Sequence, residues 1–535
     1  MSGIVGEIAP VLIGGSWISG EIADRFTSTD PASGEQVGTY PVSGWNTVDS
    51  ALNAGTAAYL ELEDLGPTSW AAFLDALAAT IERHAESLVG AAHRETALAA
   101  SPRLAQVELP RTTDQLRQAA AAARDLGWRQ PVLSPTDAIA RYRAPIPGVV
   151  VVFGPNNFPF AFNAVNGGDF AAAVATGHPV LAKGNPGHPE TTRLLARCAV
   201  EAADDAGVPR AVLQMVYDIR PDDGLRLVAD RRVAAVAFTG SKHGGLALKG
   251  AADCAGTPAY FEMASVNPVV ILPIAWKVRG GELAEEIAAS VVLGNGQFCT
   301  KPGIVFVNRE QAEAVGKIMI DTFRIQGEST LLGEGVRTGL EAAVEVLTEA
   351  GAEVRYQAEN AASGCSYATT LLQVDSETFI AAAELQTEAF GNVTMLVTWD
   401  DVASLLRCLG QLDGNLTATI YVDRGGGDDR TYAEVAPLLR ERVGRLLENK
   451  PPTGVAVVPA MNHGGPYPST GHPGFTSVGI PASLNRFTML QCFDNVADHR
   501  LPAELQADNP LGIQRDVDGC LTTDPVTWGP IHVDN

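Results

Sequence analysis

The feature that most constrains the fold is an alternation of short apolar runs and helical stretches in the middle of the chain. Buried-strand runs occur at Val149–Phe153, Pro179–Lys183, Val212–Val216 and Val233–Phe238, and a helix is expected near Ala161–Ala175 after the first of them. Strand–helix–strand units at this spacing predict right-handed crossovers and a parallel sheet. The predicted fold class is therefore α/β, with ligands expected beyond the carboxyl ends of the strands.

The flanking segments have other patterns. Val11–Tyr40 contains short β-type runs, and the stretch from Val48 to about Leu126 is helical and rich in alanine. Pro131–Pro147 is punctuated by proline, which suits an excursion out of the first domain. A second mixed α/β region runs from about Pro268 to Pro459. Phe487–Phe493 is predicted to be a strand that pairs elsewhere in the chain or with another subunit.

Length, composition and charge exclude several classes of protein. The 535 residues, 46% of them hydrophobic, predict two or three globular domains. A net charge of -24 argues against nucleic-acid and anionic-membrane partners but still permits an anionic small substrate. The seven cysteines lack paired spacing, so reduced thiols and no metal site are expected. Met1–Pro10 lacks a signal-peptide pattern, and no apolar run approaches the roughly 20 residues of a membrane span, so we expect a cytoplasmic protein.

Cys299 is the candidate nucleophile. It lies in Gly294–Gly303, between glycine-containing turns where backbone amides can approach a bound carbonyl closely. A thiolate in this position suits attack on a carbonyl carbon. The alternative is a buried structural thiol, which we retain for Cys198 and Cys254.

Two polar residues could assist such a thiol. Asn157 follows a buried strand, and its amide could donate to an oxyanion together with the N–H of Cys299. Glu262 ends another apolar run, where an apolar pocket would raise its pKa and make it a general base. The alternative for Asn157 is an ordinary turn, and the alternative for Glu262 is a solvated strand end.

An anion site is predicted at Phe238–Gly245, which ends one strand and opens a helix. Its glycines and the helix N-terminus suit a pyrophosphate. Lys183 at the end of another strand could contact a ribose or phosphate, although it could also be only solvated.

The order of these motifs resembles the aldehyde dehydrogenase superfamily over essentially the whole chain. The matching features are Pro-x-Asn-Phe-Pro, a strand-end Lys, Phe-Thr-Gly-Ser, Glu, Gly-Gln-x-Cys and Glu-x-Phe-Gly. The resemblance implies a Rossmann-type cofactor domain, an α/β catalytic domain and a small β oligomerisation arm. Their expected extents are 1–130 and 148–263 for the cofactor domain, 264–484 for the catalytic domain, and 131–147 with 485–535 for the arm and tail.

The resemblance also implies roles for individual residues. Cys299 would be the nucleophile, Glu262 the general base and Asn157 the oxyanion donor. The residues implied to bind the cofactor are Lys183, Gly240, Ser241, Glu388, which would hold the nicotinamide ribose, and Phe390 beside it.

A finer match is to the branch that contains α-ketoglutaric semialdehyde (2,5-dioxovalerate) dehydrogenase and the NADP-dependent fatty aldehyde dehydrogenases. The segments that carry this match are Glu262–Pro268, Gly296–Thr300, His463–Pro468, Thr476–Gly479 and Phe487–His499.

Two departures from the wider family bear on the pocket. The loop before Phe158 reads Pro-Asn-Asn where most members have Pro-Trp-Asn, so a tryptophan wall is missing. After Lys183, Gly-Asn-Pro186 replaces a Pro-x-Glu whose carboxylate would repel a 2′-phosphate. NADP is therefore the expected cofactor, with NAD possible. Arg220 could pair with the 2′-phosphate, or could be an ordinary surface arginine.

The predicted reaction is NAD(P)-dependent oxidation of an aldehyde to a carboxylate through a thiohemiacetal and a thioester on Cys299. The favoured substrate is α-ketoglutaric semialdehyde, giving 2-oxoglutarate. The alternatives are a medium- or long-chain fatty aldehyde dehydrogenase, a CoA-acylating relative and a catalytically silent binding protein on the same fold. The family implies a homodimer or homotetramer. No Arg or Lys can be assigned from the sequence as the anchor of a substrate carboxylate.

Overall fold

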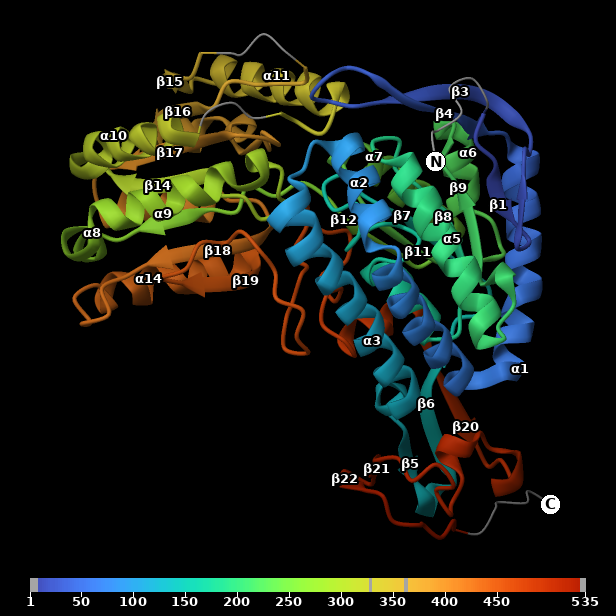
Figure 1. Cartoon of the computed structure of the whole chain (residues 1–535). Helices are drawn as coiled ribbons and strands as arrows, with labels where there is room; N and C mark the ends of the chain where they lie inside the picture. The colour runs from blue at the N-terminus through green and yellow to red at the C-terminus, as the bar shows by residue number, and fades with distance from the viewer. Residues whose placement is uncertain (1–7, 327–329, 360–363, 530–535) are drawn as a thin grey trace.

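The computed structural model describes residues 8–326, 330–359 and 364–529. Residues 1–7 and 530–535, which belong to the first and last predicted segments, lie outside this range. Figure 1 shows two α/β bodies side by side, with a narrow β arm projecting from one of them. Among the described helices, none is both long enough and apolar enough to cross a membrane.

The first body is built on a seven-stranded sheet of order β12-β11-β7-β8-β9-β1-β2. The five strands from β12 to β9 are parallel, as predicted from the alternation, and β1 and β2 form an antiparallel edge. The strands are β1 (Val11–Ile13), β2 (Ser16–Ile18), β7 (Val149–Phe153), β8 (Val180–Lys183), β9 (Leu213–Val216), β11 (Val233–Thr239) and β12 (Ala259–Glu262). The helices of this body are α1 (Trp45–Arg83), α2 (Ala85–Thr96), α3 (Leu109–Asp125), α4 (Gly168–Ala175), α5 (Pro189–Ala206), α6 (Pro221–Val228) and α7 (Lys242–Ala255). A small separate sheet contains β3 (Ile22–Thr29), β4 (Gln36–Ser43) and β10 (Asp218–Ile219).

The helix predicted near Ala161–Ala175 begins only at Gly168. The backbone N–H groups of Phe160 and Ala161 donate to Glu108 Oε1, at 2.8 and 3.0 Å. Because a buried side chain satisfies these donors, the chain after β7 forms a loop in place of the first helical turns.

The second body is a seven-stranded sheet of order β15-β16-β17-β14-β13-β18-β19 with apolar clusters on both faces. Its strands are β13 (Val269–Ile271), β14 (Ile304–Asn308), β15 (Glu353–Gln357), β16 (Thr370–Asp375), β17 (Val393–Trp399), β18 (Asn415–Tyr421) and β19 (Val443–Glu448). Its helices are α8 (Pro273–Arg279), α9 (Gly281–Val292), α10 (Arg309–Gln326), α11 (Glu334–Glu349), α12 (Ser376–Ala381), α13 (Val402–Gly410) and α14 (Asp429–Arg442).

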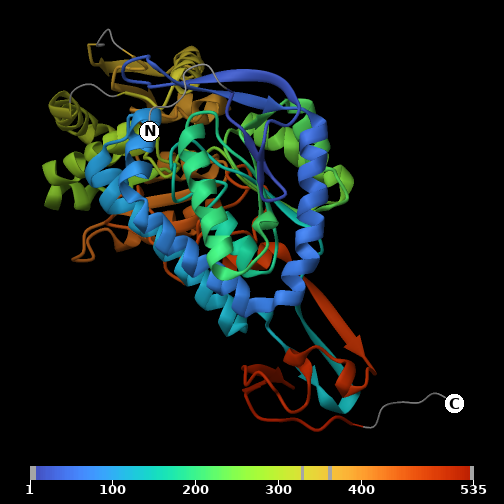
Figure 2. The same ribbon diagram turned by 45° about the vertical axis from the view of Figure 1, so that its right-hand side comes forward.

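The projecting arm is a five-stranded sheet of order β20-β6-β5-β21-β22 (Figure 2). The strand predicted over Phe487–Phe493 is β20 (Thr488–Asp494), and its partner is β6 (Ile139–Pro145) of the same chain. The remaining strands are β5 (Val132–Ser134), β21 (Arg515–Val517) and β22 (Cys520–Thr522). β20 lies at one edge of this sheet.

Candidate active site

A cavity of about 510 Å³ is lined by residues of both α/β bodies. Seven of the predicted site residues line it: Asn157, Gly240, Ser241, Glu262, Cys299, Glu388 and Phe390. Lys183 and Arg220 do not. Segments far apart in the sequence therefore meet at one site, at the carboxyl ends of β7, β11 and β12.

Cys299 lies in the loop between α9 and β14, and this loop needs its glycines. Gly294 and Gly296 have φ angles of 58° and 70°. A Cβ on Gly296 would come within 2.0 Å of the carbonyl oxygen of Gly391. The backbone can therefore pass close to the neighbouring loop only with glycine at this position.

Asn157 contacts the cysteine loop directly. Its Nδ2 donates to the carbonyl oxygen of Gln297 at 2.9 Å. An amide nitrogen has two hydrogens, so one N–H remains for a ligand beside Cys299. On the other side of the loop, Asn267 Nδ2 donates to the carbonyl oxygen of Cys299 at 2.8 Å.

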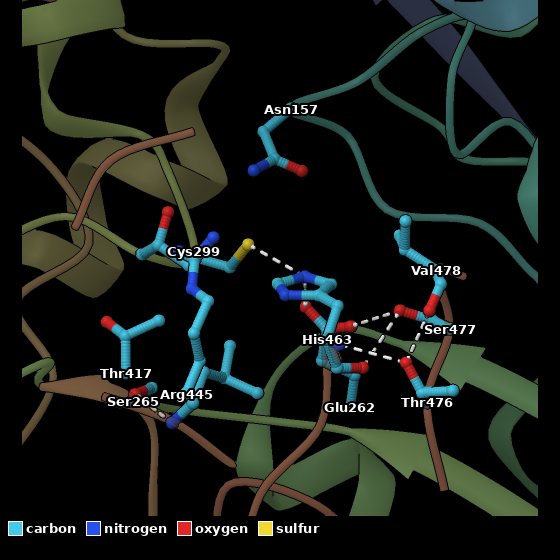
Figure 3. A network of polar contacts seen from close by, with 12 residues as sticks. Asn157, Glu262, Ser265, Cys299, Thr417, Arg445, His463, Thr476, Ser477 and Val478 are labelled. Atoms are coloured by element: carbon cyan, nitrogen blue, oxygen red, sulfur yellow. Dashed lines mark hydrogen bonds and ion pairs between the residues drawn. The ribbon is translucent and has the colours of Figure 1, made fainter. Parts of the chain in front are cut away.

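His463 joins the cysteine to the glutamate (Figure 3). Its Nε2 is 3.5 Å from Cys299 Sγ and 3.0 Å from Glu262 Oε1. Ser477 Oγ donates to Glu262 Oε2 at 3.2 Å, and the His463 and Glu262 side chains are only 1% and 2% exposed. The ligand atoms of Cys299, His463 and Glu262 lie within 4.8 Å of one another, a donor set that could also hold a soft metal ion.

His463 is a site residue to which the sequence assigned no role, although it begins the matching segment His463–Pro468. That match was the available signal, since nothing local to His463 indicates its distant partners. Its position is fixed by the backbone N–H of His463, which donates to Thr476 Oγ1 at 2.9 Å.

The pKa values of the two titratable groups at the centre, Cys299 and Glu262, shift in opposite directions. Burial raises the pKa of the Cys299 thiol well above its usual value, and the adjacent Glu262 carboxylate raises it further. Burial also tends to raise the pKa of Glu262, but the charge and hydrogen bond of His463, with Cys299 and Ser477, lower it overall. The expected raised pKa of Glu262 is therefore wrong, because a buried imidazole stabilises the carboxylate form.

Gly240 and Ser241 form the start of α7 at the cavity wall. Ser241 Oγ accepts a hydrogen bond from the N–H of Gly244 at 3.3 Å, and the N–H of Gly240 donates to the carbonyl oxygen of Glu262 at 3.1 Å. The first turn of a 14-residue helix thus faces a cavity that the reacting residues also line. This arrangement fits a dinucleotide whose phosphates lie at the helix N-terminus.

Lys183 and Arg220 already have protein partners. Lys183 Nζ pairs with Asp218 Oδ1 at 2.8 Å, and Arg220 Nη2 donates to the carbonyl oxygen of Ala23 at 2.6 Å. Neither lines the cavity: Lys183 is the last residue of β8, and Arg220 directly follows β10.

Lys301 fixes the loop that carries Glu388. Its buried Nζ donates to the carbonyl oxygens of Ala389 at 2.8 Å and Val393 at 2.6 Å. Burial raises the pKa of Glu388 to about 7, although the Lys301 charge opposes the shift. The Glu388 carboxyl group is thus held rigidly at the cavity wall and titrates near neutrality.

The site combines a parallel sheet, a helix N-terminus suited to an anion, and a buried thiol with a carboxylate partner. These features define a class of dinucleotide-dependent enzyme that works through a covalent thiol adduct. The model of the aldehyde dehydrogenase family matches residues 17–491, and the chain belongs to this family. It is an oxidoreductase that acts on aldehydes with a nicotinamide dinucleotide cofactor.

Two curated relatives cover nearly the whole chain. The chain is 35% identical to α-ketoglutaric semialdehyde dehydrogenase 2 of Azospirillum brasilense, over 95% of this chain and 98% of the relative. It is 36% identical to α-ketoglutaric semialdehyde dehydrogenase of Acinetobacter baylyi, over 89% and 91%. The expected resemblance to this branch is confirmed.

Solved structures support the fold. Aldehyde dehydrogenase C of Pseudomonas syringae, in complex with NAD+ and octanal, aligns with a TM-score of 0.78 at 20% identity, over 92% of this chain and 98% of that one. The predicted aldehyde dehydrogenase-like α/β fold is confirmed.

Proposed function

We propose that this enzyme oxidises α-ketoglutaric semialdehyde to 2-oxoglutarate with NADP+ or NAD+. The observation that carries the proposal is the meeting of Cys299, Glu262 and Asn157 at a cavity of about 510 Å³, with His463 in contact with the first two. The two α-ketoglutaric semialdehyde dehydrogenases that match almost the whole chain support the choice of substrate.

In the first half-reaction Cys299 Sγ bonds to the aldehyde carbon, and the carbonyl π electrons move to oxygen. The thiol proton passes to the Glu262 carboxylate, which accepts hydrogen bonds from Cys299 and from Nε2 of His463, and Glu262 releases this proton to solvent before the second half-reaction. The free N–H of Asn157 and the backbone N–H of Cys299 donate to the oxyanion. When bound, a nicotinamide would accept the hydride that leaves the former aldehyde carbon, and the carbonyl would then re-form as a thioester on Cys299.

In the second half-reaction the thioester is hydrolysed. Glu262 takes a proton from water as the water oxygen bonds to the thioester carbon. The carbon–sulfur bond then breaks, and the departing thiolate takes the proton from Glu262, which restores the carboxylate. The lowered pKa of Glu262 keeps it ionised and ready as the base at neutral pH.

For the cofactor we propose that Gly240 and Ser241 hold the phosphates while Glu388 and Phe390 hold the nicotinamide ribose. Lys183 is proposed to contact the adenosine side. Arg220 would meet a 2′-phosphate only by leaving the carbonyl of Ala23. Comparing kcat/KM for NADP+ and NAD+ in the parent and in Arg220→Ala tests this: a selective loss with NADP+ is expected, and an unchanged ratio contradicts it.

An apolar cluster near the thiol favours a second candidate, a medium- or long-chain aldehyde. Phe158, Phe162 and Val478 form it, with Phe298 packed against them. Initial rates with α-ketoglutaric semialdehyde, pentanal and decanal decide between the candidates. We expect the semialdehyde to have the highest kcat/KM, whereas a higher value for decanal would support the fatty aldehyde assignment.

The reaction product tests the alternative that the thioester is transferred to CoA and not hydrolysed. With Glu262 present as a base for water, we expect free 2-oxoglutarate whether or not CoA is added. Accumulation of an acyl-CoA would contradict hydrolysis.

A further inference from the structure

Arg111 on α3 is a buried cation near the reacting residues that lacks an ion-pair partner in the described structure. Its Nε donates to Gln115 Oε1 at 3.2 Å, whereas its buried Nη2 has no hydrogen-bond partner. Its guanidinium lies 5.2 Å from the ring centroid of Phe162 and 5.6 Å from that of Phe158. The residue as a whole has an intermediate exposed fraction, although Nη2 itself is buried.

The two rings beside Arg111 contact the catalytic loops, because the ring centroid of Phe162 is 6.1 Å from that of His463 and the centroid of Phe158 is 5.4 Å from that of Phe298, the residue before Cys299. Burial lowers the pKa of Arg111, and the negative charges of Glu108, Cys299 and Glu262 raise it in part. Arg111 therefore lies on the apolar wall formed by Phe158 and Phe162, outside the lining of the cofactor cavity.

Arg445 on β19 is a second such cation. Its Nη1 and Nη2 donate to the carbonyl oxygens of Gly454 at 3.1 Å and Pro452 at 2.8 Å, and its buried Nε has no partner. Figure 3 shows its side chain extending toward Cys299. Burial lowers the pKa of Arg445, and Cys299 is the negative group that opposes this.

A neighbouring arginine, Arg103, has a carboxylate partner that compensates its charge. Arg103 forms a buried ion pair with Glu108, and its Nη2 donates to the carbonyl oxygen of Asn157 at 3.2 Å. It therefore supports the oxyanion loop. Among the described residues, Arg111 and Arg445 have no carboxylate within ion-pair distance. A buried guanidinium without an anion is costly, and an anionic ligand would remove that cost.

We propose that Arg111 binds a carboxylate carried by the aldehyde substrate, and that Arg445 supplies a second positive charge to this subsite. The aromatic wall of Phe158 and Phe162 contacts the carbon chain of the substrate, between its aldehyde and its carboxylate. The ligand class is a short aldehyde with a carboxylate at its far end. This inference rests on the proposed function and deepens it, because it names the residues that select the substrate.

The kinetic test compares α-ketoglutaric semialdehyde with pentanal, a neutral aldehyde of the same chain length. In Arg111→Met we expect the ratio of kcat/KM for the semialdehyde to that for pentanal to fall about 10- to 100-fold, the range for a lost charge-assisted hydrogen bond. Arg111→Lys should restore part of the ratio, because it keeps the charge without the guanidinium fork. Arg445→Met should lower the same ratio less.

Arg117→Met is the matched control. Arg117 lies on the same helix, but it is exposed and paired with Glu82 at 2.7 Å. The ratio should not change in this variant. An equal loss with both aldehydes in Arg111→Met would show a structural role only, and no loss would exclude Arg111 from the subsite. Either result overturns the proposal.

A direct binding measurement distinguishes a failure of this inference from a failure of the proposed function. Titration calorimetry with 2-oxoglutarate and the cofactor-loaded enzyme should show binding to the parent and at least about tenfold weaker binding to Arg111→Met. If the parent oxidises pentanal better than the semialdehyde, the proposed substrate is wrong, and the calorimetry still decides whether Arg111 binds a carboxylate. Equal binding to parent and variant overturns the anchor.

Discussion

At Cys299 the protein buries a thiol beside a carboxylate, and both features disfavour the thiolate. The pKa of the thiol is raised by burial and by Glu262, while His463 Nε2 lies 3.5 Å from the sulfur. The thiol therefore stays protonated until the Glu262 carboxylate accepts its proton. Holding the nucleophile in this form limits its oxidation, because the thiolate is the reactive species.

The first prediction concerns the pH dependence of the acylation step. Below the pKa of a thiol the thiolate fraction increases about tenfold per pH unit. Since the pKa of Cys299 lies above its usual range, kcat/KM for the aldehyde should increase from pH 7 to 9 without a plateau. Stopped-flow rates at saturating cofactor measure this. A profile already flat at pH 7.5 would show that the resting enzyme holds a thiolate.

The second prediction separates chemistry from cofactor binding. Cys299→Ala should lose at least about 1,000-fold in dehydrogenation, as for other removed nucleophiles. It should still bind NADP+, because the phosphate and ribose contacts proposed at Gly240, Ser241 and Glu388 are untouched. Absorbance at the reduced nicotinamide band and cofactor fluorescence titration measure the two properties. Cys198→Ala, a buried thiol on α5, is the control and should keep its activity.

The third prediction concerns the partner of Glu262. In His463→Gln the carboxylate loses its charged neighbour, and burial then raises its pKa. A raised pKa leaves the base protonated as the pH falls, so thioester hydrolysis should slow at acidic and neutral pH and recover at alkaline pH. Single-turnover measurement of acyl-enzyme decay tests this. An unchanged pH profile of decay would show that His463 does not control Glu262.

At the scale of elements, the two bodies meet through loops that other segments hold in place. Lys301 follows the cysteine turn and donates to carbonyls on either side of Gly391, so the thiol loop and the Glu388 loop are joined by one side chain. Two loops that carry different parts of the site therefore move together. This coupling leads to the fourth prediction.

Lys301→Met leaves two buried carbonyl oxygens without a donor, each costing about 1–3 kcal/mol. We expect a lower melting temperature and about a tenfold higher KM for the cofactor, because Glu388 is no longer held at the cavity wall. Calorimetry and initial rates measure these quantities. Lys317→Met, an exposed lysine on α10, should change neither. A cofactor KM equal to that of the parent would contradict the role given to Lys301.

At the scale of the whole molecule, the sheets suggest how the chain is divided. We propose that the first sheet belongs to a cofactor-binding domain (1–130 and 148–263) and the second to a catalytic domain (264–484). The arm, 131–147 with 485–535, is proposed to join subunits into a homodimer or homotetramer. Its edge strand β20 exposes Leu490, 58% accessible, and an edge with exposed apolar side chains is suited to pairing.

The fifth prediction tests that assembly. Leu490→Lys places a charge on the β20 edge and should shift the enzyme toward monomers, as measured by light scattering after gel filtration. Val278→Lys, at a similarly exposed apolar position on α8, should leave the mass unchanged. A monomeric parent, or a Leu490→Lys variant with the mass of the parent, would contradict assembly through the arm.

The sequence by itself determined the parallel sheet and the ends of its strands. Apolar periodicity and turn residues act over a few neighbouring positions, so the pattern of residues alone assigned Lys183, Gly240 and Glu262 to strand ends. The glycines of the cysteine turn were also recognisable, because positive φ angles favour that residue type.

Only the tertiary structure decided which charges meet. It paired Glu262 with His463 and so reversed the expected direction of its pKa, and it placed Arg111 against Phe158 and Phe162 with a buried Nη2 that has no partner. It also placed Arg220 against Ala23 and chose β6 as the partner of β20. These outcomes depend on packing between segments distant in the chain. A pKa or an ion pair is set by the groups nearest in space, whereas periodicity describes only the groups nearest in sequence.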